Sequence, residues 1–429
     1  MEYKKYKLGD ICKIFGRIGF RGYTTEDLVL SPSYGAISLS PSNIVDGIMD
    51  LSKCTYISWA KYEESPEIKI TPNDIVIVKT GNSYGRTAII RNVEHPMTLN
   101  PQFVVLKDIQ INPVYLAYFL KTDEFQKQIY GIVGGSAIPT LSQEDLASLI
   151  VRVPNENIQN TIADILDSLD GKIELNKLIN DNLEAMAKQL YDYWFVQFDF
   201  PNEDGKPYKS SGGAMVWNNK LKREIPVGWS VKNLGQIATS YQQGLIRSNN
   251  QLSTDSKYGY LKMGDLDGKG QYTLQGLTRT NATNEEVDLY SLHKGDFLIN
   301  VRNSKEIVGK TCLIGYVERN TLYNHMLVRL DFKDVSTFYM NLLFNSEFMY
   351  KALDGLKQGT TTVIALYQSD LYRLPILIPA PCVMEQFSKI TDSILDQKEI
   401  ISHEIAELTK QRDELLPLLM NGQAVVNSD

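Results

Sequence analysis

The chain has 429 residues, 43% of them hydrophobic and 22% charged, which is enough for two or three domains with packed cores. No apolar run reaches the length of a membrane span, and the first ten residues contain no apolar signal region, so we expect a cytoplasmic protein. The four cysteines, Cys12, Cys54, Cys312 and Cys382, lack the C-x-x-C spacing of many metal sites and are expected to be reduced thiols.

The net charge of −7 argues against nucleic-acid binding only if it is spread evenly, and it is not. Residues 156–200 carry a net charge of −6 and residues 382–429 carry −5. Residues 1–155 are neutral and residues 201–381 carry +4. The two long segments can therefore approach a phosphate backbone.

Residues 1–155 are predicted to form a mixed α/β domain. Residues 74–78, 87–91 and 103–107 are rich in β-branched side chains and lie between turn signals, which is typical of strands. Residues 113–130 have helical periodicity, and the polar segment GNSYGR at 81–86 is expected to be a loop.

Residues 156–200 are predicted to form a long helix, because no proline interrupts the segment up to Phe198. Apolar side chains recur every seven residues, the signature of a coiled-coil seam. The seam is predicted from Ile162, Leu169, Asn176, Leu183 and Leu190, with Ile165, Ile179, Met186 and Tyr193 at the companion position. Asn176 on this seam either sets the register or is a polar residue near water.

After a linker at 201–225, residues 226–381 repeat the first domain. Strands are expected at 297–301, 311–315 and 327–331, a helix at 335–354 and a polar loop at 302–310. The offset between matching segments stays between about 222 and 226 residues, which indicates an internal repeat.

Residues 382–429 contain a second long helix, with a seven-residue series of Phe387, Ile394, Ile401, Leu408 and Leu415. A lone helix with such a stripe is unstable in water, so the two stripes are expected to bury each other. The predicted fold is mixed α/β (α+β), with two similar globular domains separated by two long helices. The helices form an antiparallel coiled coil, and the whole chain is a pseudo-two-fold internal repeat.

The tetrapeptide NPQF at 100–103 is one substitution from the NPPF motif of DNA adenine methyltransferases. A catalytic role is not expected, because no segment has the F-x-G-x-G spacing of a methyl-donor loop; FGRIGF at 15–20 has the wrong spacing. The repeat places Asn324-His325-Met326-Leu327 at the equivalent position, so a turn before a strand explains both segments.

Other catalytic motifs are equally weak. GKT at 309–311 lacks the first glycine of a phosphate-binding loop, since Ser304 stands there. Asp50 with Glu67 and Lys69 is a loose match to a nuclease site, and the second repeat has no counterpart. The four histidines have no metal-ligand spacing, so we predict no catalytic residue and no metal site in this chain.

Over essentially the whole chain, the sequence resembles the specificity (S) subunit of type I restriction–modification systems. The most specific stretches are LDGKIELNKLINDNLEAMAKQLYDYWFVQFDF, from the first long helix, and EIPVGW at the start of the second repeat. The pairing of a Pro-terminated strand with a long helix, as in IVRVPNENIQNTI and ILIPAPCVMEQFSKI, also fits this family.

The resemblance implies that residues 1–155 and 226–381 are target-recognition domains, each reading half of a bipartite, asymmetric site in double-stranded DNA. The helices at 156–200 and 382–429 would be the spacer and the docking surface for two modification (M) subunits that methylate adenine. A restriction (R) subunit would join them. No cofactor is then expected in this chain; S-adenosylmethionine, ATP and Mg would belong to the partners.

Base reading requires side chains with forked donors or amides, such as Arg for guanine and Asn or Gln for adenine. Such residues gather in the predicted loops of both repeats. We therefore expect DNA contacts from Arg17, Arg21, Asn82, Ser83, Tyr84, Arg86, Gln242, Gln243, Arg247, Arg302, Asn303, Ser304 and Lys305. Two alternatives remain: a non-catalytic coiled-coil scaffold and a self-sufficient DNA methyltransferase or nuclease.

Overall fold

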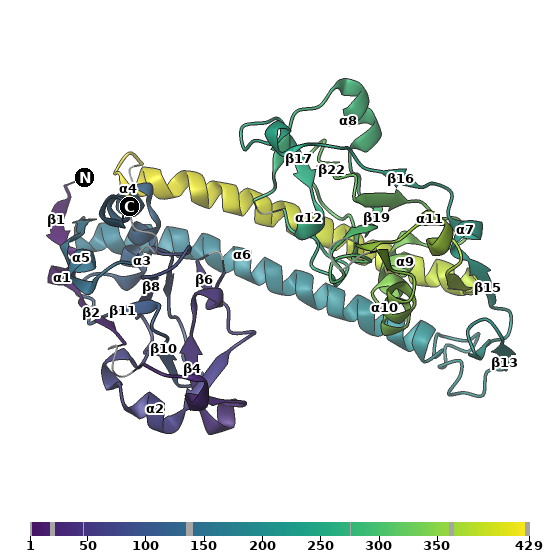
Figure 1. The fold of residues 1–429 in the computed structure, drawn as a ribbon, viewed down its shortest axis with the longest axis horizontal. Helices are drawn as coiled ribbons and strands as arrows, with labels where there is room; N and C mark the ends of the chain where they lie inside the picture. The colour runs from purple at the N-terminus through teal and green to yellow at the C-terminus, as the bar shows by residue number, and fades with distance from the viewer. Residues whose placement is uncertain are drawn as a thin grey trace. The chain divides into compact units, whose positions relative to one another are not determined.

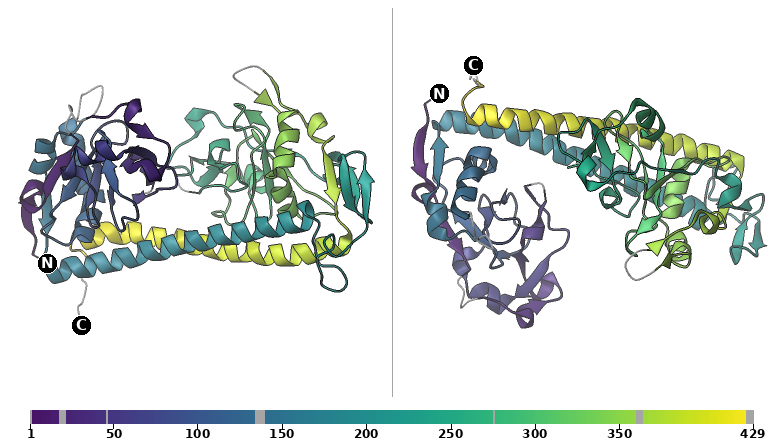
Figure 2. Two further views of the ribbon diagram at one scale, coloured as in Figure 1. Left: turned by 90° about the horizontal axis from the view of Figure 1, so that it is seen from below. Right: turned by 45° about the horizontal axis from the view of Figure 1, so that its top comes forward.

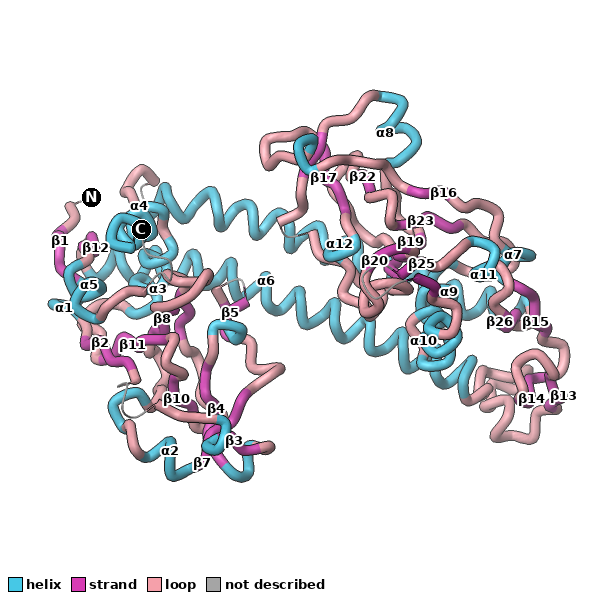
Figure 3. Tube along the Cα trace, in the orientation of Figure 1, coloured by secondary structure: helices cyan, strands magenta, loops and turns pink. Residues whose placement is uncertain are grey.

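The computed structural model describes residues 2–17, 22–45, 47–133, 140–274, 276–359 and 364–424. The chain divides into two compact units (Figure 1). Unit 1 comprises Met1–Ile173 with Glu407–Asp429, and unit 2 comprises Glu174–Ala406. Two long helices, α6 (Glu156–Tyr191) and α12 (Pro381–Met420), contribute to both units and are the longest helical segments in Figure 3.

Unit 1 contains three main sheets, with strand orders β1-β12, β10-β4-β7-β3 and β2-β11-β8-β9, and a small β5-β6 pair. Its strands are β1 (Lys4–Lys7), β2 (Lys13–Gly16), β3 (Leu28–Val29), β4 (Gly35–Leu39), β5 (Ile44–Val45), β6 (Ile48–Met49), β7 (Thr55–Ser58), β8 (Ile75–Val78), β9 (Thr87–Ile89), β10 (Met97–Leu99), β11 (Phe103–Lys107) and β12 (Ile150–Val153). Its shorter helices are α1 (Leu8–Ile11), α2 (Trp59–Glu63), α3 (Pro113–Lys121), α4 (Asp123–Val133) and α5 (Gln143–Ser148).

Unit 2 repeats this architecture, with strand orders β15-β26, β18-β17-β22 and β16-β23-β19-β21 and the additional sheets β13-β14 and β20-β25-β24. Its strands are β13 (Met215–Asn218), β14 (Arg223–Pro226), β15 (Ser230–Asn233), β16 (Gln242–Gln243), β17 (Tyr258–Leu261), β18 (Arg279–Thr280), β19 (Phe297–Asn300), β20 (Arg302–Asn303), β21 (Thr311–Leu313), β22 (Leu322–Tyr323), β23 (Leu327–Leu330), β24 (Gln358–Gly359), β25 (Ile364–Ala365) and β26 (Pro375–Ile378). Its shorter helices are α7 (Leu234–Ile237), α8 (Asn284–Tyr290), α9 (Thr337–Phe344), α10 (Glu347–Asp354) and α11 (Gln368–Leu371). The β13-β14 hairpin lies partly in the segment predicted as a linker.

The central four-stranded sheet of each unit is covered on both faces. In β8, Ile75 and Ile77 join one hydrophobic cluster, whereas Val76 and Val78 join another. Successive side chains of a strand point to opposite faces, so a continuous apolar run is required when both faces are buried. The six strands predicted in the two repeats are confirmed, and the central sheets have the same strand order in the two units.

Each short helix predicted from periodicity is two helices in the structure. α3 ends at Lys121, and the hydroxyl of Thr122 accepts a bond from the backbone N–H of Phe125 in α4. In unit 2, Ser346 caps α10 by accepting from the N–H of Met349. The apolar pattern continues across both breaks, so periodicity alone did not reveal them. Hydroxyl side chains at such positions compete with the helical backbone and begin a new helix.

The two long helices pack together in both units, which confirms the predicted helix pair (Figures 1 and 2). In unit 2, Asn180 Nδ2 donates to Ser402 Oγ at 3.3 Å, and Glu184 pairs with Lys398 at 3.7 Å. A later residue of α6 thus meets an earlier residue of α12, so the helices are antiparallel. Asn176 is half-buried on the seam, and its Nδ2 bonds to none of the described residues.

The first seam series is confirmed, whereas most of its companion positions are wrong. Ile179, Met186 and Tyr193 are 37%, 59% and 39% exposed. The buried companions lie one residue later, at Leu166, Ile173, Ala187 and Trp194. In a seven-residue repeat, the companion position can lie three or four residues after the seam residue. Only the position of α12 decides which of the two is buried. α6 also ends earlier than predicted, in a π-helical turn at Asp192–Val196.

No helix in the described part of the chain is both long and apolar enough to cross a membrane.

Candidate nucleic-acid interface

In unit 1, the loops predicted to contact DNA meet at one edge of the central sheet. β2 and β8 both run antiparallel to β11, with Gly16 opposite Val104 and Val78 opposite Phe103. Arg17, which follows β2, and Lys79, which follows β8, therefore lie beside the segment that precedes β11. The backbone N–H of Lys79 donates to the carbonyl of Gln102 at 2.8 Å, which joins the segment after β8 to the segment before β11.

The loop between β8 and β9 is a tight turn that presents polar side chains. The N–H of Tyr84 donates to Gly81 O, and the N–H of Gly85 donates to Val78 O. Gly85 has φ +84°, where an added Cβ would be strained and would lie 2.8 Å from the side chain of Gln126, so glycine is favoured at this turn. Asn82 and Arg86 are exposed on this turn, and no described residue forms a hydrogen bond or ion pair with the Arg86 guanidinium.

The neighbouring side chains of that turn are less accessible. Ser83 and Tyr84 are half-buried, and the Tyr84 ring packs edge-on against Tyr130 with centroids 5.6 Å apart. Tyr84 therefore also supports the turn.

Arg17 follows β2 at the same sheet edge but points into the domain. It is 4% exposed; its Nε donates to Leu99 O at 2.9 Å, and its Nη2 donates to Thr98 Oγ1 at 3.2 Å. Burial lowers the pKa of this guanidinium, while Tyr23 acts in the opposite direction. Arg17 connects β2 to β10 in the structure. Arg21 lies outside the described residues.

Unit 2 has the same arrangement. Gln242 of β16 lies opposite Arg329, and Asn300 at the end of β19 lies opposite Leu327. The segment after β16, the segment before β23 and the loop after β19 therefore meet at one edge. The N–H of Val301 donates to Met326 O at 2.9 Å, as Lys79 does to Gln102 in unit 1.

The segment after β19, predicted as a loop, begins with strand β20 and presents Arg302 and Lys305. Both side chains are exposed, and no described residue forms a hydrogen bond or ion pair with the Arg302 guanidinium. Asn303 and Ser304 are half-buried, and Asn303 Oδ1 accepts from the N–H of Ser304. The segment is thus hydrogen-bonded at Asn303 and exposed at Arg302.

On β16 the two neighbouring glutamines differ. Gln242 Nε2 donates to Leu289 O at 3.1 Å, and Gln242 Oε1 accepts from Arg329. Gln243 is exposed. The amide of Gln242 therefore supports the fold, while that of Gln243 faces solvent.

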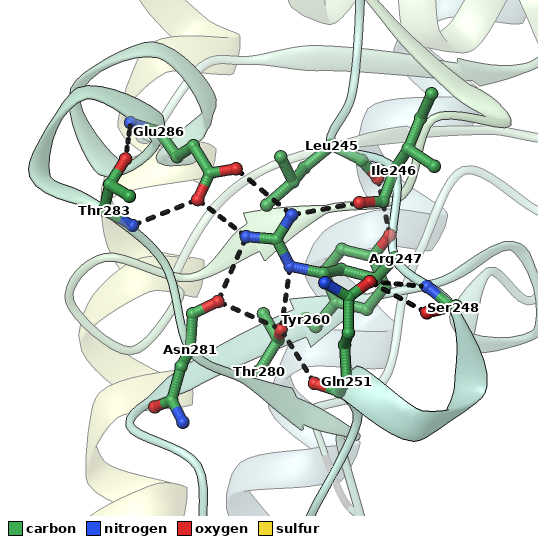
Figure 4. A network of polar contacts seen from close by, with 10 residues as sticks. All are labelled: Leu245, Ile246, Arg247, Ser248, Gln251, Tyr260, Thr280, Asn281, Thr283 and Glu286. Carbon is green, nitrogen blue, oxygen red and sulfur yellow. Dashed lines mark hydrogen bonds and ion pairs between the residues drawn. The ribbon is translucent and has the colours of Figure 1, made fainter.

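Arg247 is held by internal contacts rather than left free (Figure 4). Its guanidinium donates two bonds to Glu286, at 2.7 and 3.1 Å, and further bonds to Thr280 Oγ1 and to the carbonyls of Ile246 and Asn281. These contacts engage all five of its N–H groups. Glu286 also accepts from the N–H of Thr283 and so caps α8. This Arg247–Glu286 clasp lies on a polar surface hollow.

NPQF forms a turn that recurs in unit 2. Asn100 is 8% exposed, its Oδ1 accepts from the N–H of Gln102, and its carbonyl accepts from Phe103. Asn324 makes the corresponding bonds to Met326 and Leu327. Because both asparagines are used in shaping the chain before a strand, the structural explanation of NPQF is supported.

The other catalytic motifs also have structural roles. In GKT, Gly309 has φ +93°, and Lys310 Nζ donates to the carbonyl of Leu266 at 3.2 Å. Lys69, of the loose nuclease match, pairs with Glu63. Within the described ranges, no cluster of three acidic, histidine or cysteine side chains could hold a metal ion.

Sequence reasoning missed the neighbours of the Arg302 loop. β20 pairs with β25, which in turn pairs with β24, so Arg302 and Gln358 lie on opposite sides of the same residue, Ala365. Lys357 Nζ donates to Lys305 O at 2.9 Å. Burial lowers the pKa of His325, and the nearby Arg302 guanidinium lowers it further. These residues are distant in sequence, and no local signal indicated the pairing.

Comparison with known proteins agrees with this architecture. A family model described as Type I restriction modification DNA specificity domain matches residues 1–185 and 226–410. The type I restriction enzyme MjaIX specificity subunit of Methanocaldococcus jannaschii is 26% identical over 83% of this chain and 79% of its own length. The HindI specificity subunit of Haemophilus influenzae is 22% identical over 98% and 99%.

Among solved structures, the type I S subunit from M. genitalium aligns with a TM-score of 0.54 at 15% identity, over 97% of this chain and 96% of that chain. This likeness supports the fold, and the family match covers both repeats. The chain therefore belongs to the type I restriction–modification specificity (S) subunits, which determine the DNA recognition sequence and are themselves non-catalytic, without a cofactor of their own.

Proposed function

We propose that residues 1–155 and 226–381 are two target-recognition domains, each reading one half of a bipartite, asymmetric DNA site. One observation carries this proposal: the same sheet edge occurs in both units with different exposed side chains. Unit 1 offers Asn82 and Arg86, whereas unit 2 offers Gln243, Arg302 and Lys305. A repeated scaffold with different loop chemistry suits the reading of two different half-sequences.

The exposed side chains have the chemistry that base reading needs. Arg86 and Arg302 can each place two parallel N–H donors on a guanine, and Asn82 and Gln243 can pair with an adenine. Lys305 is better suited to a phosphate, which positions the domain without specifying a base. Ser83, Tyr84, Asn303 and Ser304 would shape these loops or contact the backbone, and Arg21 remains a candidate.

Three of the predicted contacts are assigned an indirect role in this proposal. Arg17, Gln242 and Arg247 are already bonded within the protein. Breaking such bonds to reach DNA would leave partly buried polar partners unpaired, which is costly. We propose that these residues hold the reading loops in place.

The long helices are proposed to dock two modification subunits, with a restriction subunit completing the cytoplasmic assembly. The outer surface of α6 combines acidic residues such as Glu174 and Asp181 with an apolar stripe of Leu175, Leu178, Ile179 and Met186. Exposed apolar side chains at helical spacing favour a protein partner, and the acidic residues disfavour DNA. S-adenosylmethionine, ATP and Mg would be bound by those partners.

The test is a map of methylated adenines in the host genome with this gene present and deleted. The proposal predicts that one bipartite motif loses methylation when the gene is absent and regains it on complementation. Unchanged methylation, or loss at a continuous motif, would contradict the reading of a split site.

A further inference from the structure

A single carboxylate joins three elements of unit 1. Asp170 of α6 accepts from the hydroxyl of Tyr118 in α3 through Oδ2 at 2.7 Å. Its other oxygen, Oδ1, accepts from Arg412 Nη1 of α12 at 2.9 Å. Asp170 therefore bonds to the globular part of unit 1 and to the second long helix at the same time.

The surroundings of Asp170 reinforce this joint. One helical turn earlier, Asp167 pairs with Arg91, which follows β9. The ammonium of Lys121 lies 5.3 Å from the ring centre of Tyr118. Burial raises the pKa of the Tyr118 phenol, as does the nearby Asp170, so the hydroxyl stays protonated and donates. Asp170 and Arg412 have side chains 18% and 23% exposed, which limits competition from water.

The internal repeat shows that this polar joint is not a requirement of the fold. At the positions aligned with Tyr118, Asp170 and Arg412, unit 2 has Leu342, Leu395 and Ala187. All three belong to, or pack against, one hydrophobic cluster that also contains Phe338 and Ile394. Unit 2 thus holds its globular part on the helix pair by apolar packing.

The two kinds of joint differ in what they fix. Apolar contact is non-directional, and a small rotation costs little as long as the area stays buried. A charged hydrogen bond weakens steeply when its angle changes, and here two such bonds share one carboxylate. The joint in unit 1 therefore defines the orientation of its globular part on α6 and α12 more narrowly than packing alone.

We propose that Asp170 is a positioning residue that fixes the angle of the first recognition domain on the helix pair, and that it thereby restricts the gap between the two half-sites. This inference rests on the proposed function. It concerns the spacing of the half-sequences and leaves their identity to the reading loops. The same carboxylate contacts no residue of the β8–β9 turn among its described hydrogen bonds.

The experiment uses the complete complex with Asp170→Asn. This change preserves the shape of the side chain but removes one of the two carboxylates that bind Arg412, and the other, Asp413, belongs to α12 itself. Methylome sequencing then measures methylation at the native gap relative to gaps one base pair longer or shorter. We expect this ratio to fall about tenfold, the size of effect that one lost charged hydrogen bond produces. Both half-sequences should be unchanged.

The control is Glu184→Gln, which removes the charge partner of Lys398 on the helix pair without breaking a described bond to a globular domain. It should keep the wild-type ratio. A second variant, Tyr118→Leu with Asp170→Leu and Arg412→Ala, copies the residues of unit 2 and preserves burial. It should fold, as judged by thermal melting, and relax the gap in the same way.

The outcomes separate the inference from the proposed function. If both Asp170 variants keep the wild-type ratio of methylation at the native gap to methylation at the longer and shorter gaps, the positioning role is overturned. Loss of all methylation by both, with Glu184→Gln still active, would show a purely structural role and would overturn it too. If the wild-type complex and Glu184→Gln methylate no split motif, the proposed function itself fails.

Discussion

At the scale of single residues, arginines predicted for the same role lie in different environments. Arg86 and Arg302 face solvent, whereas Arg17 and Arg247 are bonded within the protein. The sequence predicted the loops, but it could not distinguish these two states. Thr280 and Glu286, which bind the Arg247 guanidinium, lie more than thirty residues further along the chain. The distinction therefore depends on tertiary structure.

Replacing Arg302 and Arg247 by alanine should therefore have different consequences. Arg302→Ala should leave the thermal midpoint unchanged and cost ~1–3 kcal/mol of preference at one base position. Arg247→Ala should lower the free energy of unfolding by about 2–3 kcal/mol, because Glu286 and two carbonyls lose a partly buried partner. Denaturant unfolding and methylome sequencing of both variants measure these effects. Equal destabilisation by the two changes would contradict the assignment.

Asn100→Ala tests whether NPQF has a structural or a catalytic role. The side chain of Asn100 supports a turn, so its loss should cost about 1 kcal/mol of stability and leave methylation by the complex within a few-fold of normal. Steady-state methylation assays at saturating donor provide the measurement. A drop of several orders of magnitude, without unfolding, would show that NPQF takes part in the chemistry.

At the scale of elements, periodicity predicted the long helices and their pairing but not which flank of the seam is buried. The face at Leu166, Ile173 and Ala187 packs inward, and the face at Met186 is open. The breaks at Thr122 and Ser346 were missed for the same reason: apolar spacing does not record where a hydroxyl caps the next helix. Contacts between distant segments determine both the buried flank of the seam and the positions of the helix breaks.

Leu166→Ala and Met186→Ala make a matched pair for this correction. Leu166 is fully buried in the core of unit 1, so its truncation should cost about 2–5 kcal/mol of unfolding free energy. Met186 is 59% exposed, and its truncation should change stability by less than about 0.5 kcal/mol. Met186→Ala should nevertheless weaken binding of the modification subunit, measured by calorimetry. If Met186→Ala binds the modification subunit with wild-type affinity, the apolar stripe is not part of the docking surface.

At the scale of the whole molecule, the internal repeat was the most informative sequence signal. It predicted two similar α/β domains and two long helices, and the sheet orders confirm that the central fold is repeated. It also showed that Asn100 and Asn324 share a structural position. The apolar joint of unit 2 and the ionic joint of unit 1 were not predicted, because each combines residues from three separate segments.

The helix pair is predicted to act as a ruler for the gap. Four residues inserted near Asn176 would lengthen α6 by ~6 Å and shift its seven-residue seam. This change alone should destabilise the protein, because the stripes of α6 and α12 would no longer face each other. A matched insertion near Ile401 should restore folding and move methylation to sites with a longer gap. An unchanged gap in a folded, active double variant would exclude the helices as the ruler.

The most direct measurement is methylome sequencing after residues 1–155 are exchanged for the matching domain of a relative. If each repeat reads its own half-site, one half of the methylated motif changes to that of the donor while the other half and the gap are retained. Loss or change of both halves together, in a folded complex that still methylates DNA, would contradict independent reading by the two domains.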